Sequence, residues 1–414
     1  MLKPLNEDDI KSYVAATLCR SESYIVPLAA VIQSKTAGNP FYMREMLDSC
    51  HRKQCIYYDY KESGWCYDLD KIFHQFETKS YHDTLDTAFV TSRLHELPPA
   101  TRSILASASL IGHSFSFELV QRLLSGEFDF DDSDADADMT CPPLVSYSAQ
   151  DAIEGLQAAI QAYIIVSTQD DDRFRFAHDR YMQAATSLGE CNTSKMHFII
   201  ARTLLKYSSS EERAQSDIAE HIGASIDIIR RRLLHRQSFR TLLADCAQSA
   251  AERGARPTAA RYYKNCFALL QDNPWTDGLP DVYYDETLQL HIRAAETYLY
   301  MGQYPEAKRV LAKVFTYANT PVDKSPAWVL QSRIYAQEGD SPAAFRALKH
   351  CLEALDIAVD DEPSYEKCDA EFERLSLKVQ SMQFDDVINR STKSDSNFAA
   401  VGAVLVETIS AAFW

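Results

Sequence analysis

Tyr298-Leu299-Tyr300-Met301-Gly302-Gln303-Tyr304-Pro305-Glu306-Ala307 is the stretch that decides the fold. In it an aromatic residue is followed after four positions by a glycine, and after five more by an alanine. Glycine permits a tight turn between two antiparallel helices, and the small alanine lets the second helix pack closely against the first. Leu311 and Val314 continue the apolar face of the second helix. The stretch therefore predicts a helical hairpin.

The same pattern, with an aromatic or small residue at its first position, occurs twice more, beginning at Ala250 and at Tyr335 on the two sides of this hairpin. The glycines of the second and third copies are 37 residues apart, close to the roughly 34-residue tetratricopeptide period. The first two copies are 48 apart because the segment 273–280 lies between them. We expect a tetratricopeptide-like α-solenoid, with a generic helical bundle as the alternative. The residues expected to pack the repeats are Gly254, Ala259, Tyr298, Gly302, Ala307, Tyr335, Gly339 and Ala344.

The N-terminal half alternates helical patterns with two short hairpin patterns. Aromatic-rich runs at 54–60 and 64–68 flank a polar turn, and runs at 163–167 and 173–176 flank an acidic one. Three helices ending in the second hairpin give the outline of a winged-helix domain, which by itself does not establish DNA binding.

We therefore expect a mostly α protein in which a winged-helix-like domain with short β-hairpins precedes the solenoid. The expected parts are a helical subdomain with a β-hairpin over residues 1–84, the winged-helix-like domain over 85–190, and tetratricopeptide-like repeats over 191–414, truncated at the C-terminus.

Composition argues against several classes of partner and location. Asp and Glu outnumber Lys and Arg by 59 to 42, so the net charge of −17 repels nucleic acid. No uncharged apolar run reaches the roughly 18–20 residues of a membrane span, and no secretory signal begins the chain. Ten cysteines without any Cys-x-x-Cys pair predict neither zinc nor disulfides. We expect a cytoplasmic protein whose partners are proteins.

An acidic loop at 127–140 interrupts the winged-helix-like part, with seven carboxylates between Glu127 and Asp138. A calcium-binding EF-hand loop needs a glycine at its sixth position and a glutamate at its twelfth. Counted from Asp132, these positions hold Ala137 and Pro143. We therefore predict a solvated loop and expect no metal site.

No catalytic motif is present in the sequence. A phosphate-binding loop requires Gly-x-x-x-x-Gly-Lys followed by Ser or Thr, and none of the 12 glycines precedes a lysine. His95-Glu96-Leu97 is similar to the start of a histidine-kinase phospho-acceptor box, but Pro98 follows too early and the segment is typical of a helix end. We expect no catalytic residues in this chain.

Two motifs are candidate binding elements. Gly38-Asn39-Pro40-Phe41 begins a helix, where proline suits the first turn. Phe176-Ala177-His178-Asp179-Arg180 follows the second hairpin, and His178 could cap a helix or be satisfied in the core. Each has a structural explanation when taken alone. They occur in this order, about 140 residues apart.

These two motifs resemble those of the signal-transduction ATPases with numerous domains, the STAND class of AAA-type ATPases. The chain more closely resembles the central region of fungal hybrid sensor histidine kinases. Five segments in order carry this resemblance over nearly the whole chain: Lys35–Tyr42, Gly64–Asp68, Arg93–Pro98, Phe176–Ala185 and Ser332–Asp340. In that family a kinase-like domain precedes an ATPase module and helical repeats, and a sensor domain, a histidine kinase and a receiver follow.

The resemblance implies roles for individual residues. Pro40, with Gly38 and Asn39 beside it, would lie against an adenine ring, and His178 would meet the β-phosphate of ADP and hold a closed, inactive state. ADP or ATP would be the cofactor of the intact parent protein. The family's phosphate loop and Mg²⁺-binding strand have no counterpart here, so we expect a fragment, a split gene product or a decayed copy, with little or no affinity for ATP.

Three functions remain open. The first is a regulatory and scaffold segment of a phosphorelay, in which the winged-helix half closes over a nucleotide and the repeats bind a partner protein. The second is a stand-alone tetratricopeptide-like adaptor in which Gly38-Asn39-Pro40 and His178 are relics. The third, a winged-helix transcription factor, is disfavoured by the acidic net charge.

Overall fold

The computed structural model describes residues 3–76, 85–125, 147–168, 172–189, 193–207, 212–359, 364–382 and 396–413. The acidic loop at 127–140, with the calcium-loop positions considered there, lies outside the described residues. Packing divides the chain into two compact units. One comprises Met1–Ser109, Gly155–Val166 and Phe176–Leu188, and the other comprises Leu110–Glu154, Ser167–Arg175 and Gly189–Trp414. The division at residues 84 and 190 stays a prediction.

The chain is mostly helical with two small sheets, which confirms the predicted fold class. The first unit begins with three helices and a hairpin, whose apolar faces share one core around Ile10, Ile25 and Met43. The two strands are antiparallel, with Ile56 opposite Tyr67. The bounds are α1 (Glu7–Leu18), α2 (Glu22–Thr36), α3 (Pro40–Arg52), β1 (Ile56–Asp59), β2 (Gly64–Tyr67) and α4 (Leu69–Phe76).

The second sheet follows, with its three strands in the order β3-β5-β4. β3 is antiparallel to β5, with Phe115 opposite Phe174. The sequence predicted β4 and β5 but not β3, because a three-residue strand with one buried side chain has too short a pattern to detect. The bounds are α5 (Leu85–His95), α6 (Pro99–Ile111), β3 (Ser114–Ser116), α7 (Phe117–Ser125), α8 (Ala149–Gln161), β4 (Ile165–Ser167), β5 (Arg173–Phe176) and α9 (Asp179–Thr186).

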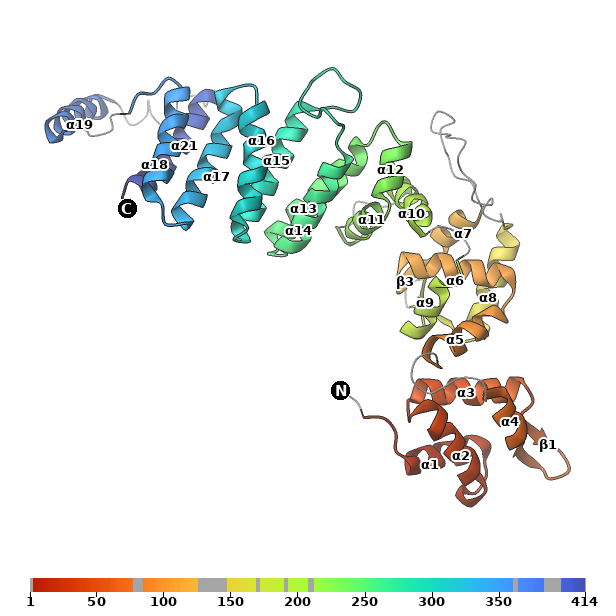
Figure 1. The fold of residues 1–414 in the computed structure, drawn as a ribbon. Coiled ribbons are helices and arrows are strands. Elements are labelled where there is room, and N and C mark those ends of the chain that lie inside the picture. The colour runs from red at the N-terminus through yellow and green to blue at the C-terminus, as the bar shows by residue number, and fades with distance from the viewer. Residues whose placement is uncertain are drawn as a thin grey trace. The chain divides into compact units, whose positions relative to one another are not determined.

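Antiparallel helix pairs stack side by side through the helical region of the second unit (Figure 1). Each of the three predicted repeats is one such pair, and α21 packs against α17 and α18 at the end of the stack. The bounds are α10 (Thr193–Tyr207), α11 (Glu212–Ala224), α12 (Ile226–Arg232), α13 (Gln237–Glu252), α14 (Arg256–Leu269), α15 (Tyr284–Tyr300), α16 (Tyr304–Tyr317), α17 (Pro321–Gln337), α18 (Ser341–Ala354), α19 (Tyr365–Gln380) and α21 (Ser396–Phe413).

The turn inside each repeat explains the spacing of the sequence pattern. Gly254, Gly302 and Gly339 have φ values of +81°, +71° and +83°, a backbone conformation that side chains other than glycine's rarely adopt. The amide after each glycine donates to the carbonyl five residues earlier, at Ala250, Tyr298 and Tyr335, over 2.8, 2.9 and 2.9 Å. This is the Schellman ending of a helix, and it fixes the four-residue interval between the aromatic or small residue and the glycine.

The alanines of the pattern are fully buried, as the predicted helix packing requires. Ala259, Ala307 and Ala344 have no exposed surface, whereas Tyr298 and Tyr335 are half-buried. A larger side chain at these alanines would push the paired helices apart, since interiors are close-packed.

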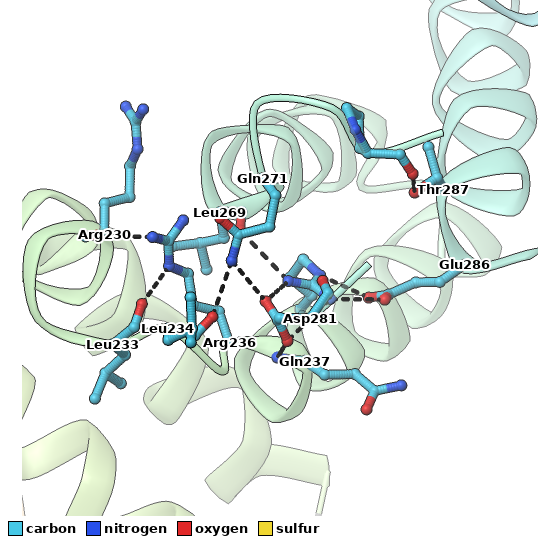
Figure 2. Close-up of polar contacts among 12 residues, drawn as sticks. Arg230, Leu233, Leu234, Arg236, Gln237, Leu269, Gln271, Asp281, Glu286 and Thr287 are labelled. Atoms are coloured by element: carbon cyan, nitrogen blue, oxygen red, sulfur yellow. Dashed lines mark hydrogen bonds and ion pairs between the residues drawn. The ribbon is translucent and has the colours of Figure 1, made fainter. Parts of the chain in front are cut away.

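A buried charge cluster holds the insertion between the first two repeats (Figure 2). The guanidinium of Arg240 is fully buried on α13 and donates to Asp281 over 2.6 Å and to both oxygens of Glu286 over 2.9 Å. Asp281 also accepts from the amide of Gln237 over 3.0 Å. The insertion is therefore joined to the start of α13 and to α15, which is how the solenoid continues across the 48-residue interval.

No helix in the described ranges is long and apolar enough to cross a membrane. Helix α19 has no buried residue and carries Phe372 and Leu377 with 73% and 68% of their surface exposed.

Candidate functional site

The motif Gly38-Asn39-Pro40 forms the entry to α3. Asn39 is the N-cap, and its side-chain oxygen accepts from the amide of Phe41 over 3.0 Å, while Pro40 is the first helical residue. Gly38 has a φ of +76°, and a Cβ there would lie 2.3 Å from the carbonyl oxygen of Leu5. The amide of Leu5 donates to Gly38 over 2.9 Å. Each residue of the motif thus has a local structural role.

His178 has the same role at the start of α9. It is the N-cap, and its Nδ1 accepts from the amide of Arg180 over 3.1 Å. Partial burial lowers the pKa of His178, with a smaller contribution in the same direction from the positive charges of Arg180 and Arg44. The ring is therefore neutral at pH 7. Because Nδ1 is an acceptor, the proton of the neutral ring lies on Nε2, where it can be donated to a ligand.

The structure brings the two motifs together through Phe41. Its ring stacks on the imidazole of His178 with 4.0 Å between centroids and 19° between planes, and it meets Tyr181 edge-on at 5.4 Å. Asn39, Pro40 and His178 are all exposed to solvent. Residues about 140 positions apart in the sequence therefore share one accessible face. We call it the Pro40–His178 face.

Charges of both signs act on His178 in this face. The side chain of Arg44 is 56% exposed, and its charge, with that of Arg180, acts on His178. The N-termini of α3 and α9 add partial positive charge. Asp179 and Glu45 act in the opposite direction on His178. A phosphate group near Nε2 would thus meet a neutral hydrogen-bond donor with two guanidinium groups in its vicinity.

Beneath the face lies a buried polar cluster of Glu45 on α3, Arg93 on α5 and Tyr181 on α9. Arg93 donates to Glu45, to the hydroxyl of Tyr181 over 2.6 Å and to the carbonyl of Ala162 over 2.7 Å. The Tyr181 hydroxyl donates to Glu45 over 2.5 Å. Burial raises the pKa of Tyr181, and the carboxylate of Glu45 raises it further. The cluster joins three helices one turn below the stacked rings.

Sequence reasoning assigned no role to these three residues. Arg93 and Tyr181 lie in two of the segments that carried the family resemblance, and Glu45 lies just after a third. The available signal was a carboxylate among positions that are otherwise apolar on α3, since Met43 and Met46 beside it are buried. A buried carboxylate requires a partner, but the sequence alone does not say which one.

No group of three or more His, Cys, Asp or Glu side chains is arranged to hold a metal ion within the described part of the chain.

No family model matches this sequence. The chain is 26% identical to peroxide stress-activated histidine kinase mak3 of Schizosaccharomyces pombe, over 86% of this chain and 14% of that protein. It is 22% identical to peroxide stress-activated histidine kinase mak2 of the same yeast, over 96% of this chain and 16% of that protein. This chain thus spans only a small part of the length of either relative.

A third relative is hybrid signal transduction histidine kinase G of Dictyostelium discoideum, 27% identical over 29% of this chain and 3% of that protein. Among solved structures, a STAND protein with a tetratricopeptide repeat sensor from Pyrococcus horikoshii aligns over 99% of this chain and 54% of its own. Its TM-score is 0.36 and its identity 13%. The chain is therefore similar in sequence to proteins named as histidine kinases, which supports a role in signal transduction.

Proposed function

We propose that this chain is a regulatory segment of a signal-transduction ATPase in a histidine-kinase phosphorelay. In this proposal the Pro40–His178 face senses an adenine nucleotide and the helical repeats bind a partner protein. Pro40 would contact the base, and Nε2 of His178 would donate to a phosphate oxygen. A phosphate-binding loop, which this sequence lacks, would come from another segment or another chain.

The observation that carries the proposal is the stacking of Phe41 on His178. It places the two motifs of the nucleotide hypothesis on one exposed face with Arg44 nearby. Weak binding is expected from this face alone, because two helix N-termini, the exposed Arg44 and the partly buried Arg180 replace only part of the contacts that a phosphate loop makes.

ADP binding to the full chain tests this proposal. We expect ADP at millimolar concentration to raise the thermal unfolding midpoint, since any ligand that binds only the folded state stabilises it. AMP should raise the midpoint less, because it lacks the β-phosphate. No shift with ADP would contradict a nucleotide role for this chain by itself.

Two substitutions at His178 distinguish its role as a helix cap from its proposed role in binding nucleotide. His178→Ala removes the N-cap acceptor of α9 and should lower stability by about 1 kcal/mol even without nucleotide. His178→Asn keeps a capping oxygen but not the imidazole, so it should keep the unliganded midpoint and lose the response to ADP. A response to ADP that survives in His178→Asn would exclude the imidazole from the site.

A second candidate is a stand-alone adaptor that acts through its repeats alone. The capping roles of Asn39 and His178 and the contact of Gly38 with Leu5 favour it, because they account for both motifs without a nucleotide. This candidate predicts that ADP leaves the unfolding midpoint of the wild-type chain unchanged.

A further inference from the structure

A basic segment spans the last turn of α12 and the connection that leads to α13. We define the arginine loop as residues 230–236, which contain Arg230, Arg231, Arg232 and Arg236 together with His235, in a chain whose net charge is −17. Arg230 and Arg231 are exposed and Arg232 is partly exposed. Throughout the described ranges, none of these three side chains forms an ion pair. A concentration of unpaired positive charge is unusual in so acidic a protein.

Helix capping accounts for only one of the four arginines. Arg236 donates from Nε to the carbonyl of Leu233 over 2.7 Å and from Nη2 to that of Arg230 over 2.8 Å, so it caps the end of α12. Figure 2 shows the guanidinium of Arg230 pointing away from this network. A helix of seven residues has a small dipole, which needs no further compensation from three more arginines.

The backbone of the arginine loop is held in place by the buried cluster at Arg240. Gln271 donates to the carbonyl of Leu234 over 2.9 Å and to Asp281 over 3.3 Å, and Asp281 is bound by Arg240 (Figure 2). The side chain of Leu234 is nevertheless 53% exposed. The loop thus presents an apolar group among positive charges on an ordered backbone, so binding would cost little conformational entropy.

We propose that the arginine loop binds an acidic segment of a partner protein. Carboxylates of that segment would pair with Arg230, Arg231 and Arg232, since guanidinium groups bind carboxylates through two parallel hydrogen bonds, and an apolar side chain would pack on Leu234. A nucleic acid or an anionic membrane carries extended negative charge that the rest of this acidic chain repels. A short acidic peptide needs only the local patch.

Fluorescence anisotropy of a labelled twelve-residue peptide of Glu-Glu-Leu repeats, added to the full chain, tests the proposal. We expect binding at 50 mM salt that weakens as salt rises, and a loss of about tenfold in the double variant Arg230→Glu, Arg231→Glu. The matched control is the double variant Arg309→Glu, Arg374→Glu at two exposed positions. It changes the net charge by the same amount and should alter binding less than twofold. Leu234→Ala, at an exposed position, should weaken binding about threefold and serves if the double variant does not fold.

Three results would overturn the proposal. Absence of binding at low salt would exclude an acidic peptide as a ligand of the arginine loop. An equal loss in both double variants would show that affinity follows net charge alone. Tighter binding of oligo-dT, or of vesicles containing phosphatidylserine, with the same dependence on Arg230 and Arg231, would assign the loop to a polyanion other than a protein.

Discussion

Gly38 and Gly302 have nearly the same backbone conformation but different surroundings. Their φ values are +76° and +71°, yet a Cβ at Gly302 would meet nothing within 4 Å, whereas at Gly38 it would overlap the carbonyl oxygen of Leu5. At position 302, glycine is needed only for the left-handed backbone conformation of the turn. Gly38 also allows the N-terminal segment to approach the entry of α3.

Alanine substitution separates these two roles. Gly302→Ala should cost about 1 kcal/mol, the strain of a left-handed conformation in a residue with a side chain. Gly38→Ala should cost more, about 2–3 kcal/mol, because the backbone at Leu5 must also move. Urea unfolding of the two variants beside the wild type measures both costs. Equal destabilisation would show that the contact with Leu5 contributes nothing to stability.

At the scale of elements, α3 and α9 are joined at two levels. Phe41 and His178 stack at their N-termini, and Glu45 and Tyr181 meet one turn further on, with Arg93 of α5 between them. The exposed contact belongs to the proposed ligand-binding face, while the buried contacts fix the spacing of the two helices. A buried charged cluster of this kind is strongly destabilised when one partner is removed, because the remaining charge is left unpaired.

Removing partners in turn tests this arrangement. Tyr181→Phe deletes one hydroxyl that Glu45 and Arg93 share and should cost about 1–3 kcal/mol. Arg93→Met leaves the carboxylate of Glu45 buried without its main partner and should cost about 3–5 kcal/mol. The control is Tyr163→Phe at a residue that is 72% exposed, where little change is expected. If thermal unfolding of Arg93→Met matches that of the control, the cluster does not hold the helices together.

At the scale of the whole molecule, stability should depend on pH through buried histidines. Burial, with a smaller contribution from His197, whose Nδ1 is 2.7 Å from that of His221, lowers the pKa of His221 to about 4. Burial likewise lowers the pKa of His291 to about 4. The unfolded chain binds these protons with a pKa near 6.5. The free energy of unfolding therefore has its full value above about pH 6.5 and decreases as the pH falls toward 4, because the unfolded chain then binds more protons than the folded one.

The expected loss for each buried histidine is on the order of 2–3 kcal/mol at pH 4.5 relative to pH 7.5. In His291→Gln the difference in unfolding free energy between these two pH values should shrink by about that amount. His350→Gln, at an exposed side chain, should leave the difference unchanged. Urea unfolding at both pH values measures it, and identical differences in all three proteins would contradict the buried-histidine account.

By itself the sequence determined the repeats. Each repeat depends on features within about ten residues: a glycine of positive φ, a hydrogen bond from the next amide to the carbonyl five residues before that amide, and a fully buried alanine. Local patterns of this kind can be read without knowing the rest of the fold. The two hairpins were predicted for the same reason, whereas β3 is too short to leave a pattern.

Only the tertiary structure decided which charges meet. Glu45 and Tyr181 are 136 positions apart, Glu45 and Arg93 are 48 apart, and Arg240 and Glu286 are 46 apart. The sequence shows that a buried charge needs a partner, but the choice of partner depends on how the helices pack, and packing has no local periodicity. The same holds for the Pro40–His178 face, which exists because the ring of Phe41 bridges two helix starts that the chain places far apart.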